Sequence, residues 1–431
     1  MRFELGKREV SLIMFKKIHF KNGLRVVTVP LRNTRSTVIL VLVRAGTKYE
    51  TKEKNGISHF LEHMCFKGTE KRPCPFDISK EVDRVGGIFN AFTSKDYTGY
   101  FVKVDFSHFN LGVDIVSDIF LHSIFKEEEI EKERGVILEE MKMLEDTPTH
   151  YIEDLFEKLL YGDQPAGWNI VGTKKAVLNI KREDLIKYTK EHYVAKNVVV
   201  TVAGRIQPHK ATSLIERYFS DIRKGEPKKK KKVKEKQIKP NTLFCKKETE
   251  QTHLALGVRT FNMFHKARYI LSVMATLLGG NMSSRLFQEI REKRGLAYYI
   301  STHSEVNPDT GYLVSYAGVD HKKINEVVSL ILEEYKKIKE KDLSKKEVER
   351  AKEYLKGRLR LSLEESENVA SFYGSQELLE NRILTPEEKI KEIEKVTPGD
   401  IKEVGKEIFM KNKLNLAVIS PYHRAFKHFS I

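Results

Sequence analysis

The sequence predicts an α+β fold with two duplicated domains, each a mainly antiparallel sheet covered by helices. Three observations lead to this prediction. Apolar, strand-like runs at residues 24–31 and 37–43 precede long stretches whose apolar residues recur at helical spacing beside charged faces. Patterns in the first half of the chain recur in the second half. The 431 residues, 40% of them hydrophobic, are enough for two cores of ordinary domain size.

The recurrence is clearest near the end of each half. Asp184 lies nine residues before Tyr193, Asp400 lies nine residues before Phe409, and an apolar strand pattern follows each pair. Further upstream, a helical stretch that begins at Glu129 has a counterpart that begins at Glu347. These matches indicate that the two halves are duplicated domains.

A lysine-rich segment separates the halves. Residues 223–239 contain ten Lys and Arg against two Glu, and Pro227 and Pro240 flank the unbroken lysine run. Such a segment buries little apolar surface, and its like charges keep it extended. Met14 is a second plausible start of the chain. We therefore predict an N-terminal zinc-binding domain at 14–222, a linker at 223–240 and a C-terminal domain at 241–431.

The net charge of +17 would fit a nucleic-acid-binding protein, but much of the excess lies in the linker. The linker has no interleaved aromatic side chains to stack on bases, and no recognisable nucleic-acid module surrounds it. We expect a solvated linker and no nucleic-acid partner. A polyanion-binding arm is the alternative.

The cysteines and the apolar runs bear on the compartment. Cys65, Cys74 and Cys245 match no disulfide framework or zinc ribbon. The longest aliphatic run, residues 38–43, is far shorter than the roughly 20 residues that span a bilayer. The first dozen residues do not resemble a secretory signal. We expect a cytoplasmic protein with reduced thiols and no membrane span.

The sharpest motif is His59-Phe60-Leu61-Glu62-His63, which lies in an amphipathic helical pattern. On a helix, His59 and His63 are one turn apart, and Glu62 lies on the same face. Two imidazoles with this spacing can bind one Zn²⁺, and the carboxylate can reach a water on the metal. The order of residues is that of the inverted zincin motif. Taken alone, the motif also fits a solvated polar helix face.

A second predicted helix offers candidates for a third ligand. Glu133 and Glu140, seven residues apart, share one face of it. A carboxylate from a second helix would complete a three-ligand catalytic site and leave the fourth position for water. Glu139 is the competing candidate, although it points about 100° away from Glu140 on a helix.

With these residues, the sequence resembles the pitrilysin/insulysin family of zinc metallopeptidases from about residue 14 onward. That family includes the mitochondrial processing peptidases and small bacterial relatives. The resemblance implies that His59, His63 and Glu140 bind one Zn²⁺ per chain and that Glu62 is the general base. It also implies that Glu133 supports the site without binding the metal.

The segment 86–100 strengthens the resemblance. Two glycines followed by alternating bulky and polar residues indicate a turn into a strand. The resemblance makes this the edge strand beside the metal, where a substrate peptide adds as an extra strand. It implies substrate contacts from the side chain of Asn90, the backbone of Ala91 and the neighbouring Phe92. A purely structural hairpin is the alternative.

The second half contains no His-x-x-Glu-His motif, and the position matching Glu140 falls near Lys356 or Arg358. A cation cannot bind zinc, so we expect this domain to be metal-free. The resemblance implies instead that Arg291 and Tyr298 reach the active site from it and donate to the carbonyl oxygen as that atom gains negative charge. Simple packing between helix and strand is the alternative role.

The predicted activity is zinc-dependent endopeptidase cleavage of unstructured peptides or small proteins in a closed chamber. Because four such domains enclose the chamber in the family, a chain with two domains is expected to pair. A homodimer is the simplest arrangement, and a heterodimer with an inactive homologue is the alternative. A targeting-peptide processing subunit and a non-enzymatic scaffold subunit are the competing functions.

Overall fold

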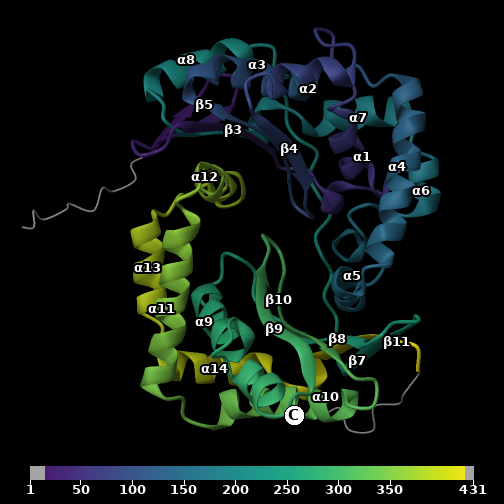
Figure 1. The fold of residues 1–431 in the computed structure, drawn as a ribbon, viewed down its shortest axis with the longest axis vertical. Helices are drawn as coiled ribbons and strands as arrows, with labels where there is room; N and C mark the ends of the chain where they lie inside the picture. The colour runs from purple at the N-terminus through teal and green to yellow at the C-terminus, as the bar shows by residue number, and fades with distance from the viewer. Residues whose placement is uncertain (1–14, 423–431) are drawn as a thin grey trace, which may run out of the picture.

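The computed structural model describes residues 15–422. It contains two sheets, one in each half of the chain, and Figure 1 shows the first half above the second with α12 and α5 between them. The first sheet has the strand order β1-β2-β6-β3-β5-β4 and the second has the order β7-β11-β8-β10-β9. The strands are β1 (Lys16–His19), β2 (Arg25–Pro30), β3 (Ser36–Val43), β4 (Ile88–Thr93), β5 (Thr98–Asp105), β6 (Val198–Gly204), β7 (Asn241–Lys246), β8 (Thr252–Arg259), β9 (Ala297–Val306), β10 (Gly311–Val319) and β11 (Leu414–Ser420).

The two sheets share one topology, which confirms the predicted α+β fold with two duplicated parts. In each sheet the first of the five matching strands pairs in parallel with the last, β2 with β6 and β7 with β11. All other neighbours are antiparallel. The edge strand β4 of the first sheet therefore corresponds to the edge strand β9 of the second.

Helices connect and cover the strands. In the first half they are α1 (Ile57–Met64), α2 (Pro75–Asp83), α3 (Phe109–Leu121), α4 (Glu127–Glu145), α5 (Pro148–Tyr161), α6 (Lys174–Leu178), α7 (Arg182–His192) and α8 (Pro208–Tyr218). In the second half they are α9 (Arg268–Gly279), α10 (Ile324–Glu340), α11 (Lys345–Ser362), α12 (Ser366–Glu380), α13 (Pro386–Glu394) and α14 (Pro398–Ile408), with a π-helical turn at Phe287–Glu292. In residues 15–422, no helix is both long enough and apolar enough to cross a bilayer.

The central strands are apolar on both faces. β3 reads Ser-Thr-Val-Ile-Leu-Val-Leu-Val, and the last seven of these residues are buried. Ile39, Val41 and Val43 face a core built with helices of the first half, which include α1 and α3. Val38, Leu40 and Leu42 face the opposite side. A strand of this kind is stable only where both faces of its sheet are covered.

The second face of each sheet is covered by a helix from the other half. Val369 and Ala370 of α12 pack on the first sheet, against a cluster that includes Val38 and Leu40. Conversely, Phe156 of α5 is fully buried against the second sheet, where its ring lies 5.6 Å from that of Tyr312. The two halves therefore exchange one helix each.

A buried ionic cluster joins the halves at the ends of their edge strands. Lys48 Nζ lies 2.8 Å from Asp96, which follows β4, and 2.7 Å from Asp309, which follows β9. Lys230 of the lysine-rich segment pairs with the same two carboxylates. The side chain of Lys230 is 15% exposed, so this one lysine of the run is held between the two halves.

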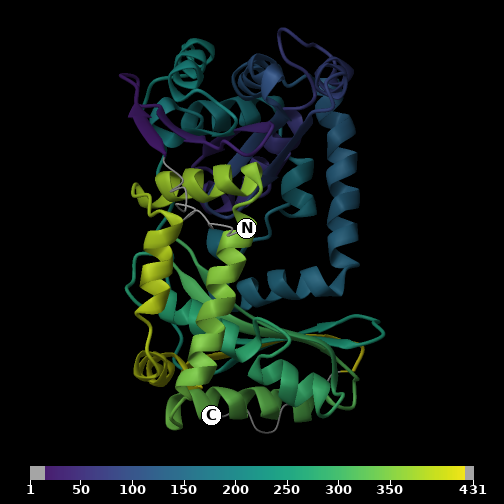
Figure 2. The same cartoon turned by 60° about the vertical axis from the view of Figure 1, so that its left-hand side comes forward.

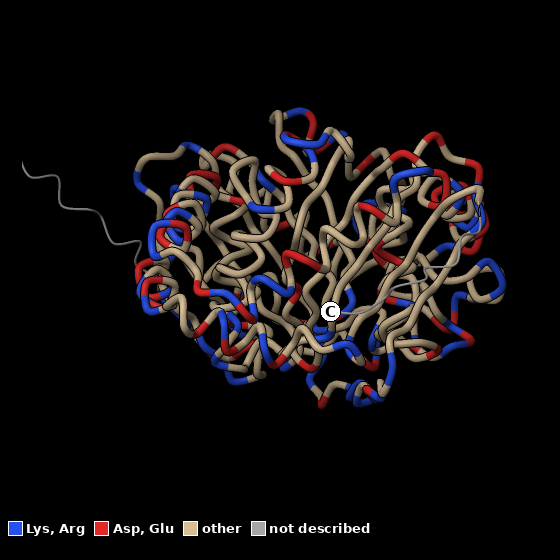
Figure 3. Tube along the Cα trace, turned by 90° about the horizontal axis from the view of Figure 1, so that it is seen from below, with Lys and Arg blue, Asp and Glu red and all other residues tan. Residues whose placement is uncertain are grey.

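The basic residues do not form a continuous surface on the side seen in Figure 3. Lys and Arg are interspersed with Asp and Glu over that face. Many of these charges are paired locally on single helices, as for Lys337 with Glu333 on α10 and Lys406 with Glu403 on α14.

The helix exchange leads to a prediction about stability. Phe156→Ala should lower the free energy of unfolding by roughly 3–5 kcal/mol, because it removes a fully buried aromatic ring from the second sheet. Urea denaturation followed by circular dichroism measures this change. Phe76→Ala is the control, because Phe76 is 69% exposed. Equal stability of the two variants would show that α5 is not held by this packing.

Candidate metal centre

Helix α1 presents the two histidines of the motif. The helix spans eight residues, and its apolar side chains Phe60, Leu61 and Met64 are buried in the first core. His59 and His63 lie one turn apart, and their Nε2 atoms are 3.3 Å apart. Two atoms bound roughly 2.0–2.1 Å from a tetrahedral metal would be about 3.3–3.4 Å apart, so this separation fits a shared zinc ion.

Helix α4 brings Glu140 to the same point. Glu140 Oε1 lies 3.5 Å from His59 Nε2, and Glu140 Oε2 lies 3.5 Å from His63 Nε2. The ligand atoms of these three residues all lie within 4.8 Å of one another. In the described part of the chain, no other group of three or more His, Cys, Asp or Glu side chains meets this criterion. Two imidazoles and a carboxylate are a donor set that suits Zn²⁺.

The two neighbouring glutamates of α4 lie in different surroundings. The side chain of Glu140 is 28% exposed, whereas that of Glu139 is 73% exposed and pairs with Lys142. Glu139 is not part of the histidine cluster. Of the two candidates for a third ligand, the fold thus brings Glu140 to the histidines.

Glu133 supports one histidine from behind. Its side chain is 6% exposed, and its Oε1 accepts a hydrogen bond of 2.8 Å from His63 Nδ1. Its Oε2 lies 2.6 Å from Lys67 Nζ. Burial alone would raise the pKa of Glu133, but His63 and Lys67 outweigh it and lower this pKa. A carboxylate on the second nitrogen of a metal-binding histidine fixes the ring orientation.

The cluster is electrostatically coupled. Hydrogen bonds from His59 and His63 hold the pKa of Glu140 well below its usual range. Burial disfavours the charged form of His63, but Glu133 and Glu140 outweigh this effect and raise its pKa to about 9. The surrounding carboxylates therefore favour positive charge at the point where the three ligand atoms meet. Unlike Nδ1 of His63, which binds Glu133, Nδ1 of His59 is buried without a hydrogen-bond partner among residues 15–422.

Glu62 lies on the same helix as the two histidines and contacts the edge strand β4. Its Oε2 accepts a hydrogen bond of 2.5 Å from the hydroxyl of Thr93, the last residue of β4. This contact links the predicted general base to the predicted substrate strand. Neither Thr93 nor Lys67 stands out in the sequence, because contacts between distant segments leave no local pattern.

The predicted substrate residues lie on β4, which is an edge strand. Asn90 is exposed, and its Oδ1 accepts a hydrogen bond of 2.9 Å from the backbone N–H of Ala91. Ala91 packs against the core that contains α1, whereas Phe92 faces the core that contains α12. The side chains of Ala91 and Phe92 thus point to opposite faces of the sheet.

Arg291 and Tyr298 lie in the second half, in the π-helical turn and at the start of β9. The Arg291 guanidinium lies 4.9 Å from the centre of the Phe287 ring, and Tyr298 is 73% exposed. No hydrogen bond or ion pair within residues 15–422 joins either side chain to the histidine cluster. Tyr299, the next residue of β9, packs against the cluster that contains α5, and Asp309 beyond the other end of β9 pairs with Lys48.

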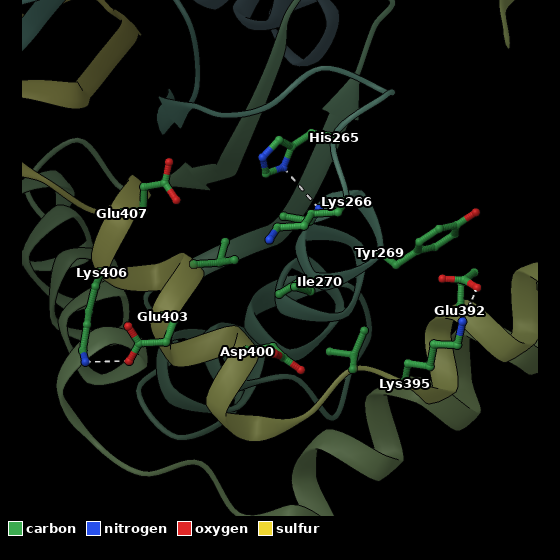
Figure 4. Close-up of a pocket in the computed structure, with 13 residues that line it drawn as sticks. His265, Lys266, Tyr269, Ile270, Glu392, Lys395, Asp400, Glu403, Lys406 and Glu407 are labelled. Carbon is green, nitrogen blue, oxygen red and sulfur yellow. Dashed lines mark hydrogen bonds and ion pairs between the residues drawn. The ribbon is translucent and has the colours of Figure 1, made fainter.

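A pocket away from the histidine cluster lies in the second half, between α9, α13 and α14 (Figure 4). It has a volume of about 700 Å³, and its lining includes His265, Glu392 and Glu403. Glu403 pairs with Lys406, and Glu392 pairs with Lys395. Each of these carboxylates is paired with a lysine three residues later, so the pocket does not resemble a metal centre.

Comparison with known proteins supports the resemblance inferred from the motifs. A family model described as insulinase, peptidase family M16, matches residues 25–174, and one described as the peptidase M16 inactive domain matches residues 179–355. YmxG of Bacillus subtilis, described as an uncharacterized zinc protease, is 38% identical over 95% of this chain and 98% of its own length. A Rickettsia felis protein with the same description is 36% identical over 93% of this chain and 96% of its own length.

Solved structures match over nearly the whole chain. A protease from Helicobacter pylori superposes with a TM-score of 0.88 at 27% identity, covering 95% of this chain and all of that one. A Pseudomonas fluorescens protein, described as a peptidase M16 inactive domain, has a TM-score of 0.87 at 17% identity, which shows the shared fold. It covers 95% of this chain and 98% of its own. These matches, together with the histidine and glutamate cluster, show that the chain belongs to the insulinase family of peptidases, family M16.

Proposed function

We propose that this chain is a zinc-dependent endopeptidase that cleaves unstructured peptides or small proteins. The observation that carries the proposal is the convergence of His59, His63 and Glu140, with Glu62 on the same helix as the histidines and in contact with the edge strand β4. The names of the relatives support zinc protease chemistry in general. The substrate class, the enclosed chamber and the roles of individual residues are our proposal.

His59, His63 and Glu140 would hold the zinc, with Glu133 orienting His63. When bound, the metal would polarise a water molecule and the carbonyl of the scissile peptide bond. Glu62 would accept a proton from the attacking water and deliver it to the leaving amine. Thr93 donates a hydrogen bond to one oxygen of the Glu62 carboxylate, and the other oxygen would act as the base.

The substrate would bind as an added strand along β4. An edge strand offers unpaired N–H and C=O groups, which give affinity for an extended main chain with little demand on its sequence. The N–H of Ala91 is one such group, because its hydrogen bond goes to the Asn90 side chain instead of the neighbouring strand. A substrate carbonyl would replace Asn90 Oδ1 as the acceptor, which frees the Asn90 amide to bind the substrate backbone.

Arg291 and Tyr298 would act from a second copy of the chain. Within residues 15–422 of one chain, neither side chain contacts the cluster of His59, His63 and Glu140. Both side chains carry donors suited to an oxyanion. A homodimer would enclose four domains around two active sites. A pair with an inactive homologue is the alternative arrangement.

The central test compares the wild type with Glu62→Gln on a mixed library of unstructured peptides. The variant should lose on the order of 10²–10⁴-fold or more in kcat, which is the usual contribution of general acid–base catalysis. Zinc measured by atomic absorption should remain stoichiometric, because Glu62 is not part of the ligand cluster. Near-normal cleavage by Glu62→Gln would refute the role of Glu62.

Adjacent glutamates provide a matched test of the metal ligands. Glu140→Gln should weaken zinc binding at least 100-fold, because it removes the carboxylate that meets both histidines. Glu139→Gln should bind zinc as the wild type does, because Glu139 is exposed and paired with Lys142. Competition with a fluorescent zinc chelator measures both affinities. The reverse order of affinities would move the third ligand to Glu139.

Donation between chains can be tested by mixing two inactive variants. Glu62→Gln keeps Arg291 and Tyr298, whereas the double variant Arg291→Ala, Tyr298→Phe keeps Glu62. If the donors come from a second copy, coexpressed heterodimers contain one complete site, and part of the peptidase activity should return. If the donors act within one chain, every site stays defective and the mixture should remain inactive.

A further inference from the structure

The carboxylate of Glu50 contacts the start of α1, the helix that carries His59 and His63. Glu50 is 5% exposed and lies in the loop that precedes the helix. Its Oε2 accepts hydrogen bonds from the backbone N–H of Gly56, at 2.8 Å, and from the Asn55 side chain, at 2.9 Å. Its Oε1 accepts one from the backbone N–H of Ser58, at 2.9 Å. One buried carboxylate thus binds two backbone donors at the start of α1.

The position that normally caps a helix cannot do so here. The residue before α1 is Gly56, which has a φ of 96° and no side chain to accept a hydrogen bond. A Cβ at Gly56 would lie 2.6 Å from the carbonyl oxygen of Val171. On the other side of this contact, a Cβ at Gly172 would lie 2.2 Å from the carbonyl oxygen of Asn55. Because the two backbones touch, position 56 has no room for a side chain that could cap the helix. The first N–H groups of the helix therefore need an acceptor from elsewhere.

Keeping a carboxylate in this position has an electrostatic cost. Burial raises the pKa of Glu50, while its hydrogen bonds from Asn55, Gly56 and Ser58 oppose the rise. In the described part of the chain, no Lys or Arg forms an ion pair with it. The partial positive charge at the start of α1 is the counter-charge that the structure provides.

We infer that Glu50 is a positioning residue for the metal ligands, an inference that rests on the proposed zinc peptidase function. An eight-residue helix is too short to be stable by itself, so its orientation depends on anchors and packing. Ser58, whose amide binds Glu50, directly precedes His59. Its hydroxyl also lies 2.8 Å from the hydroxyl of Tyr188 on α7. Fixing the first turn of α1 fixes His59, and the helix carries that orientation to Glu62 and His63.

Glu50→Gln tests the inference with little change in side-chain size. The amide replaces one acceptor oxygen by an NH₂ group, which must face a backbone N–H or the Asn55 amide. We expect a 10–100-fold loss of zinc affinity, as for other residues that orient metal ligands, and a lower kcat with an unchanged KM. In the metal-free protein, hydrogen exchange of the Gly56 and Ser58 amides should accelerate. Glu53→Gln is the matched control, because Glu53 is exposed in the same loop.

Two further variants separate positioning from general destabilisation. Phe156→Ala should lower stability and leave zinc affinity unchanged, because Phe156 packs on the second sheet. Glu50→Asp keeps the charge but shortens the side chain, and it should lose zinc affinity to an intermediate degree. It carries the test if Glu50→Gln does not fold. Wild-type zinc affinity and amide exchange in both Glu50 variants would overturn the inference.

These readouts also separate the inference from the proposed function. If the wild type binds zinc but cleaves no peptide, the affinities of the Glu50 variants still decide the role of Glu50. If the wild type binds no zinc, the proposed function fails, and unchanged amide exchange in Glu50→Gln would show independently that Glu50 does not anchor α1.

Discussion

The burial of two sheets that are apolar on both faces is the constraint on which the rest of this structure depends. The helices of one half cover only one face of each sheet, so the second face needs a partner. That partner is α12 for the first sheet and α5 for the second. Because each helix crosses to the other half, the arrangement of the two halves follows from the burial of their own cores. In Figure 2, α5 runs from the lower end of α4 toward the second half, so the helix that carries Glu140 is continued by the helix that seals the second sheet.

Each sheet ends in two edge strands, β1 and β4 in the first and β7 and β9 in the second, and the candidate site lies beside β4. Glu62 is held by the last residue of β4, and the histidines lie on the helix that packs behind that strand. The cluster of Lys48, Asp96, Asp309 and Lys230 joins the ends of β4 and β9. A cluster with this degree of burial is sensitive to the loss of any member, because the remaining charges would be left uncompensated.

Features whose determinants are local can be predicted from the sequence. The spacing of His59, Glu62 and His63 sets their common helix face directly, and the seven-residue interval between Glu133 and Glu140 does the same on α4. The duplication was visible because both sheets reuse one order of elements. The resemblance to the insulinase family, confirmed by the family models, followed from these motifs.

Other features depend on contacts between distant segments and could not be predicted. The apolar pattern of α5 or α12 shows that the helix has a buried face, but not which sheet covers it. Lys230 is one of five consecutive lysines, and only the fold distinguishes it from Lys229 or Lys231. Glu50 matches no capping motif, because it lies six residues before Gly56, the position from which a side chain normally caps the helix. Arg291 and Tyr298 remain predictions, since their proposed partner site lies on a second chain.

The helix exchange also determines the order in which the molecule can be completed on the ribosome. The first sheet is complete once β6 has been made, but α12 begins about 160 residues later. At roughly 5–20 residues per second, the face containing Val38 and Leu40 waits on the order of ten seconds for its cover. During that interval the nascent chain exposes an apolar sheet face, which is the kind of surface that aggregates or binds chaperones. The first half is therefore made early but reaches its native packing only when the second half is nearly finished.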